Sequence, residues 1–203
     1  EEPADVDPAS YDLVTSVLSL HWVNDLPGTL IQIRRALKPD GLFLGCLFGA
    51  GTLTELRTAF LEAESELTGG AAARVSPLPG LQDMAGLMQR AGFTLPVVDV
   101  EPVTVRYDDP FALMRDLKGM GEQAAFAASE KSPRRPLSRR ILARMAEIYK
   151  ERFADPDGRL RATFNVVWLS GWAPDESQPK PLRPGSARHS MADAVRKSGR
   201  KED

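Results

Sequence analysis

An alternation of strand, helix and strand near the start of the chain most constrains its fold. Tyr11–Ser16 is a short β-branched and apolar run that is typical of a buried strand. Apolar residues then recur at helical spacing over Leu26–Leu37, after Asp25 in an N-cap position. Lys38–Gly41 ends this helix, and Leu42–Leu47 is an almost continuous apolar run, as in a strand with helices on both faces. The unit predicts an α/β fold.

Segments downstream continue this alternation. Thr52 and Glu55 have the spacing of a capping box at the start of a helix. Val97–Tyr107 is rich in Val and Thr, and Pro102 within it indicates an edge strand or a bulged one. Leu160–Trp172 has the bulky side chains of a last strand. Further helices are predicted over Leu81–Ala91, which Gly92 closes, over Phe111–Leu117, and around Leu137, Ile141, Met145 and Ile148.

The chain divides into a folded part, residues 1–172, and a polar tail, residues 173–203. The helices expected around 108–152 would form an insertion in the folded part. The tail has few apolar residues and several prolines near its beginning, so it cannot build a core of its own. We expect it to be partly disordered.

Composition excludes several classes of protein. With 42% hydrophobic and 27% charged residues, the chain fits one soluble globular domain, and its apolar runs are too short to span a membrane. Its 26 basic and 28 acidic residues leave no positive excess to hold nucleic acid. The single cysteine, Cys46, excludes an intrachain disulfide, and the two histidines, His21 and His189, are too few for a Cys/His zinc site.

The same features favour a reducing, cytoplasmic setting. The first residues lack an initiator Met and show no secretory signal, so we expect the sequence to begin within a longer protein.

Several short motifs together resemble a known enzyme family. Asp12–Ser16, Leu18–Trp22 and Leu37–Phe43 have the spacing found in the second half of class I S-adenosylmethionine-dependent methyltransferases. A narrower likeness rests on His21–Pro27, Thr52–Arg57, Arg90–Phe93, Asp116–Glu122, Ala162–Phe164 and Gly171–Pro174. These runs are similar to the subfamily of the mitochondrial complex I assembly factor reported as a protein-arginine hydroxylase. That subfamily includes bacterial relatives, and it resembles the biotin-pathway carrier-protein methyltransferase.

The resemblance implies a partial Rossmann-like methyltransferase sheet, with strands 4 to 7 and their flanking helices but without strands 1 to 3 and the glycine loop. Neither a glycine-rich turn nor the acidic residue that holds the ribose precedes Asp12. The glycines of Gly45–Gly51 follow the second strand of this chain, where they would border a substrate cleft or, as the alternative, form a nucleotide loop. The free edge of Tyr11–Ser16 would pair with a second copy of the chain, or the chain was cut from a longer one.

The resemblance also implies contacts with the cofactor S-adenosylmethionine. Ser16, Val17 and Leu18, at the end of the first strand, would contact its methionine part, and the alternative is an ordinary strand end. Glu1 and Glu2 occupy the place of an acidic loop beside the adenine.

Three positions downstream of that strand complete the expected site. His21 is the candidate catalytic residue because an imidazole just beyond a strand end can act as a general base, and the alternative is that it caps and packs. Trp22 is expected to wall the cofactor pocket. Gly49, Gly121 and Glu122 are expected beside the substrate, although carboxylates around a glycine turn are often solvated. No metal site is expected.

Two functions follow as hypotheses. The first is transfer of a methyl group from S-adenosylmethionine to a small molecule or a protein side chain. This chemistry needs few catalytic residues, because the sulfonium cofactor is already activated. The second is a scaffold for the assembly of respiratory complex I, with or without hydroxylation of a partner's arginine. The sequence leaves the methyl acceptor open.

Overall fold

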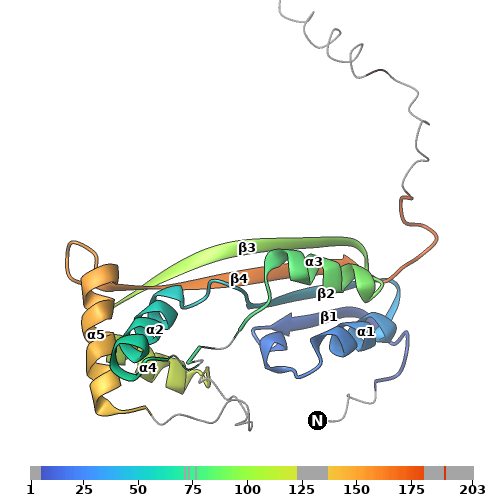
Figure 1. The fold of residues 1–203 in the computed structure, drawn as a ribbon. Coiled ribbons are helices and arrows are strands. Elements are labelled where there is room, and N and C mark those ends of the chain that lie inside the picture. The colour runs from blue at the N-terminus through green and yellow to red at the C-terminus, as the bar shows by residue number, and fades with distance from the viewer. Residues whose placement is uncertain are drawn as a thin grey trace, which may run out of the picture.

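A computed structural model describes residues 6–70, 72, 74–75, 77–122, 137–180 and 190 of the chain. Its core is a four-stranded sheet with the spatial order β1-β2-β4-β3 (Figure 1). β1 runs parallel to β2, whereas β4 is antiparallel to both β2 and β3. The strands are β1 (Tyr11–Val17), β2 (Leu37–Phe48), β3 (Thr94–Tyr107) and β4 (Leu160–Trp172). The predicted α/β class is confirmed.

The helices gather at the two ends of the sheet, with α2, α4 and α5 at one end and α1 and α3 at the other (Figure 1). Asp25 caps α1, since its carboxylate accepts the N–H of Gly28 at 2.9 Å. Gly92, just after α3, has a φ of +87°, which glycine adopts without strain. The helices are α1 (Leu26–Ala36), α2 (Thr54–Thr68), α3 (Leu81–Arg90), α4 (Pro110–Gly119) and α5 (Arg139–Phe153), with a short 3₁₀ helix at Leu20–Trp22.

The capping box predicted at the start of α2 is wrong. Leu53, in a left-handed conformation with a φ of 54°, immediately precedes the helix. Thr52 and Glu55 bind β4 instead of each other: the Thr52 hydroxyl accepts the N–H of Asn165 at 3.0 Å, and the Glu55 carboxylate accepts the N–H and hydroxyl of Thr163. Both side chains therefore join α2 to the sheet.

Two expectations for β2 also differ from the structure. Lys38–Gly41 is not a separate turn, because β2 begins at Leu37, which pairs with Tyr11 of β1. Helices on both faces of Leu42–Leu47 were expected, yet the side chain of Leu44 is 42% exposed. No helix in the described part of the chain covers this side of β2 at that point.

Two hydrophobic clusters bury opposite faces of β4. Near its start, Leu160, Ala162 and Phe164 are buried in a cluster with α2, α4 and α5. Near its end, Val167 and Leu169 are buried in a cluster with α1 and α3. Side chains alternate between the faces of a strand, so the change from even to odd numbers places the two clusters on opposite faces of β4. We call them the α5 cluster and the α1 cluster.

The sheet face opposite the α1 cluster carries exposed apolar side chains. Val17 on β1 is 71% exposed, Val97 on β3 is 61% exposed and Trp168 on β4 is 47% exposed. The pairing register places these residues on the same side of the sheet as Leu44. Within the described residues, β1 pairs with β2 alone, so its outer edge is free.

β3 forms the opposite edge of the sheet, as Pro102 predicted, and this edge is protected. Proline has no backbone N–H to offer to another strand. Two residues earlier, the N–H of Val100 is bound by the Asp99 carboxylate at 2.8 Å. These two features reduce the donors that the edge presents to a further strand.

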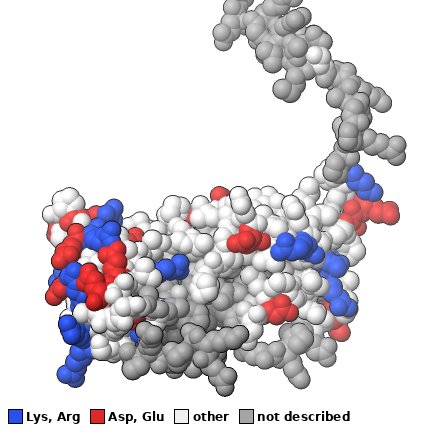
Figure 2. All heavy atoms as spheres, viewed as in Figure 1, with Lys and Arg blue, Asp and Glu red and all other residues white. Residues whose placement is uncertain are grey.

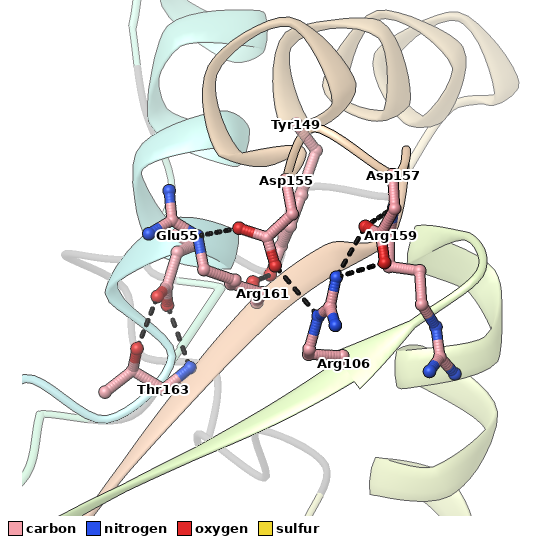
Figure 3. A network of polar contacts seen from close by, with 8 residues as sticks. All are labelled: Glu55, Arg106, Tyr149, Asp155, Asp157, Arg159, Arg161 and Thr163. Atoms are coloured by element: carbon pink, nitrogen blue, oxygen red, sulfur yellow. Dashed lines mark hydrogen bonds and ion pairs between the residues drawn. The ribbon is translucent and has the colours of Figure 1, made fainter.

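Ion pairs hold the beginning of β4 against the end of β3 (Figure 3). Arg106 on β3 contacts Asp155 at 2.8 Å and Asp157 at 2.5 Å, and Arg161 on β4 contacts Asp155 at 3.1 Å. The backbone N–H of Arg159 and the Arg106 guanidinium hold the pKa of Asp157 below its ordinary value.

The outer surface of α2 and α5 is rich in charge of both signs, as Figure 2 shows at the α5 end of the molecule. Arg144 on α5 binds Glu66 on α2 at 2.6 Å, and Arg152 binds Glu62. The hydrogen bond from Arg144 lowers the pKa of Glu66. Such mixed pairs fit a solvated surface between two helices.

Candidate functional site

A pocket of about 100 Å³ lies among residues that follow the parallel strands β1 and β2. His21 and Trp22 come shortly after β1, and Phe48 is the last residue of β2. Ligands of open α/β sheets bind outside the carboxyl ends of parallel strands, so this is the expected place for a site. Its apolar lining comes from Phe48, Leu53, Leu56, Leu78, Leu117 and Phe164.

His21 and Glu122 meet in this pocket. The Nε2 atom of His21 lies 2.9 Å from Oε1 of Glu122, and the two side chains are 3% and 17% exposed. The Nε1–H of Trp22 donates to the same carboxylate oxygen at 3.3 Å. The His21 ring also packs against Phe48, with 5.1 Å between ring centroids. The structure thus brings the predicted catalytic residue, the predicted wall and one predicted substrate residue into one cluster.

Gly121 determines where Glu122 lies. It has a φ of +79° at the end of α4, and the N–H of Glu122 reaches back to the carbonyl of Leu117 at 2.8 Å. The N–H of Gly121 donates to the carbonyl of Lys118, so the two bonds close the helix in a Schellman motif. Gly121 is absent from the pocket lining. Its glycine character orients the residue that follows it.

Arg74 and its partner Glu64 are site residues that the sequence reasoning missed. Glu64 on α2 is 2% exposed, and its Oε1 atom accepts hydrogen bonds from Nε and Nη2 of Arg74 at 2.8 and 2.5 Å. Its other oxygen accepts the N–H of Ala72 at 2.5 Å. These bonds hold the segment after α2 so that Arg74 and Val75 line the pocket. Only the apolar face of α2 had a sequence signal.

The turn between β2 and α2 is fixed to β4. Gly49 donates its N–H to the carbonyl of Asn165 at 2.8 Å, and the Asn165 amide donates to the carbonyl of Ala50 at 2.9 Å. A Cβ on Gly49 would lie 2.3 Å from Val167, and one on Gly51, whose φ is +89°, would lie 2.4 Å from the Asn165 amide. Gly49 therefore packs against β4 and is absent from the pocket lining.

The predicted cofactor residues of β1 lie at its open carboxyl end. The Val17 side chain is 71% exposed, and Leu18 has a φ of 47° while its N–H binds the carbonyl of Cys46 at 2.9 Å. The Ser16 hydroxyl is 2.8 Å from the hydroxyl of Ser19. Trp22, which follows this strand end in the chain, lines the pocket. Glu1 and Glu2 lie outside the described residues.

Asp116, the other carboxylate near Gly121, is absent from the pocket lining and exposed. Burial, and then the Asp116 charge and hydrogen bond, raise the pKa of Tyr107. Within the described part of the chain, no group of three His, Cys, Asp or Glu side chains is placed to hold a metal. Every helix described is too short or too polar to span a lipid bilayer.

Comparison with known proteins connects this geometry to a family. A methyltransferase-domain family model matches residues 1–97. Over 184 residues the chain is 45% identical to the mitochondrial arginine-hydroxylase NDUFAF5 of Danio rerio, covering 91% of this chain and 56% of that protein. Over 166 residues it is 39% identical to the malonyl-[acyl-carrier protein] O-methyltransferase of Halorhodospira halophila, covering 80% and 52%. The chain spans about half the length of these curated relatives.

The fold has relatives among solved structures. A methyltransferase structure from Bacillus halodurans superposes with a TM-score of 0.51 at 13% sequence identity, covering 84% of this chain and 68% of that one. At this identity the likeness concerns the fold. The family match over residues 1–97, the two sequence relatives and the shared fold together make this chain similar to the class I methyltransferases.

Proposed function

We propose that this chain supplies the acceptor side of an S-adenosylmethionine-dependent methyltransferase that acts on a small molecule or a protein side chain. The observation that carries the proposal is the pocket beside the ends of β1 and β2, which contains the His21–Glu122 pair. The similarity to methyltransferases supports the cofactor.

The proposed roles divide between two groups of residues. Ser16, Val17, Leu18 and Trp22 would hold the methionine part of the cofactor, which when bound supplies an electrophilic methyl group on a sulfonium. The apolar lining would exclude water from the acceptor. Because methyl transfer depends mainly on aligning the two reactants, such a pocket needs few reactive groups. His21 is the proposed catalytic residue, and Glu122 lies beside the acceptor.

Calorimetry with S-adenosylmethionine tests this proposal. The titration uses the chain itself and a longer protein in which residues corresponding to the amino-terminal half of the relatives precede it. We expect the longer protein to bind and its Ser16→Trp variant to lose binding, because the indole would fill the end of β1. Ser65→Trp on the exposed side of α2 is the matched control. Binding by neither protein, or undiminished binding by Ser16→Trp, contradicts the proposal.

A second candidate is hydroxylation of a partner's arginine, or a scaffold role in respiratory complex I assembly. The 45% identity to an arginine-hydroxylase favours it. Glu122 adds a physical reason, because a pocket carboxylate can accept hydrogen bonds from a guanidinium. Mass spectrometry of co-purified proteins distinguishes the candidates. Addition of a methyl group supports the first and addition of an oxygen atom the second, whereas a complex I subunit bound without modification supports the scaffold.

The compartment and the oligomeric state also stay proposals. A cytoplasmic location agrees with the buried free thiol of Cys46, while the arginine-hydroxylase relative is named as mitochondrial. A homodimer through the free edge of β1 would place Tyr11–Val17 of two copies side by side. Sedimentation velocity over a range of concentrations tests it, and a monomer at every concentration contradicts it. The domain limits 1–172 and 173–203 are likewise proposals.

A further inference from the structure

One nitrogen of His21 is buried and has no hydrogen-bond partner among the described residues. The ring is 3% exposed, and its Nδ1 atom is the unpaired one, while Nε2 is bound to Glu122. A carboxylate can only accept a hydrogen bond, so the neutral ring carries its proton on Nε2 and presents a lone pair at Nδ1. Leaving a buried acceptor unpaired costs stability, and such an atom therefore points to a ligand that donates to it.

The surroundings of the ring suit a proton acceptor. The aromatic rings of Phe48 and Trp22 lie 5.1 and 5.6 Å from it between centroids, so the environment is of low polarity. The charged groups in the described lining of the pocket are Glu122 and Arg74. Glu122 is hydrogen-bonded to the ring and would stabilise an imidazolium, whereas Arg74 is bound to the Glu64 carboxylate.

We propose that Nδ1 of His21 accepts the proton of a substrate hydroxyl or amine during methyl transfer, with Glu122 as its positioning residue. This inference rests on the proposed function and narrows the acceptor to a nucleophile that carries a proton. In the step, the substrate O–H or N–H bond breaks and its proton moves to Nδ1. The electron pair of the oxygen or nitrogen forms the bond to the methyl carbon, and the electrons of the methyl–sulfur bond stay on the sulfur of the sulfonium donor.

The proposed arrangement of His21 and Glu122 can be tested without catalytic turnover. The chain has two histidines, so NMR of isotope-labelled histidine gives few signals, and His21→Gln assigns them. We expect the Nε2–H tautomer for His21 and a mixture of tautomers in Glu122→Gln, whose amide can either donate or accept. Glu66→Gln, which changes an exposed carboxylate on α2, is the control and should leave the tautomer unchanged. An Nδ1–H tautomer in the wild type, or no change in Glu122→Gln, overturns the inference.

The proton transfer itself is tested with two probe acceptors. Phenol carries a proton on its nucleophilic oxygen, and iodide carries none. In the longer protein with S-adenosylmethionine, we expect His21→Gln to slow methylation of phenol by roughly 10²–10⁴-fold, the usual contribution of a general base, and to leave methylation of iodide within about twofold. Glu66→Gln should alter neither rate.

The outcomes separate the inference from the proposed function. If His21→Gln slows the methylation of phenol and of iodide equally, His21 acts in packing or cofactor binding, and the inference is overturned. An unchanged rate of phenol methylation in His21→Gln also overturns it. Methylation of iodide without any methylation of phenol by the wild type overturns the inference and keeps the proposed function. A wild type that binds no S-adenosylmethionine and methylates neither probe overturns both.

Discussion

Replacement of the buried Glu64 by glutamine is expected to loosen one wall of the pocket. The carboxylate is 2% exposed and accepts hydrogen bonds from the Arg74 guanidinium and the Ala72 N–H. Glutamine keeps the size of the side chain but removes its charge, so the guanidinium, itself 17% exposed, loses its ion pair with Glu64. Breaking one side of a buried pair costs about 3–5 kcal/mol. Because Arg74 retains some exposure to water, we expect the lower end, about 3 kcal/mol.

For a domain of this size, that loss corresponds to a fall in Tm of roughly 6–12 °C. Urea unfolding followed by the fluorescence of the three tryptophans measures the loss in the free energy of unfolding. Glu66→Gln is the matched control, since Glu66 lies on the same helix but is 47% exposed in its pair with Arg144. A Glu64→Gln loss no larger than that of Glu66→Gln would refute the reasoning. A double-mutant cycle with Arg74→Met measures the coupling between the two side chains, which should be about 0.5–3 kcal/mol.

Three further predictions concern the turn between β2 and α2, the ion pairs before β4, and the outer edge of β3. Gly51→Ala should lower the free energy of unfolding, measured in urea, by roughly 1–3 kcal/mol, because a Cβ at a φ of +89° meets the Asn165 amide of β4. Gly119→Ala is the control; it has open space around its Cβ and should lower that free energy far less. Asp157 has a lowered pKa, so its contribution to stability is present above the unfolded carboxyl pKa and lost as pH falls through the folded one. Asp157→Asn should therefore flatten the fall in unfolding free energy below about pH 4, and an unchanged slope contradicts this. Pro102→Val combined with Asp99→Ala should expose the β3 edge and promote association in sedimentation velocity; an unchanged sedimentation coefficient at high concentration contradicts the protective role.

The helices and strands that were predicted correctly are those with signals in neighbouring residues of the sequence. Tyr11–Ser16 and Leu160–Trp172 agree with β1 and β4 to within a residue, because β-branched and aromatic runs are bounded there by polar segments. Asp25 caps α1, and Gly92 follows α3, as their residue types indicate. These features depend on neighbours within one helical turn. The order β1-β2-β4-β3 was not predicted, because periodicity within one segment does not say which strands pair.

Long-range partners account for most of what the sequence did not reveal. Thr52 and Glu55 have capping-box spacing, yet residues of β4 more than a hundred positions away bind both side chains. His21 and Glu122 were separate predictions, and their contact spans 101 positions. Glu64 sits on an amphipathic helix, where a charged residue would be expected at the surface; its burial depends on Arg74 in the following segment. No local pattern contains such pairings.

The change of buried face along β4 determines what lies on each side of the pocket. Phe164 and Leu117 in the lining belong to the α5 cluster, while Leu20, next to His21, belongs to the α1 cluster. The pocket therefore lies between the α5 cluster and the α1 cluster, which the sheet joins. β4 contributes side chains to both clusters, so the strand around Val166 sets the separation of the clusters and with it the width of the pocket.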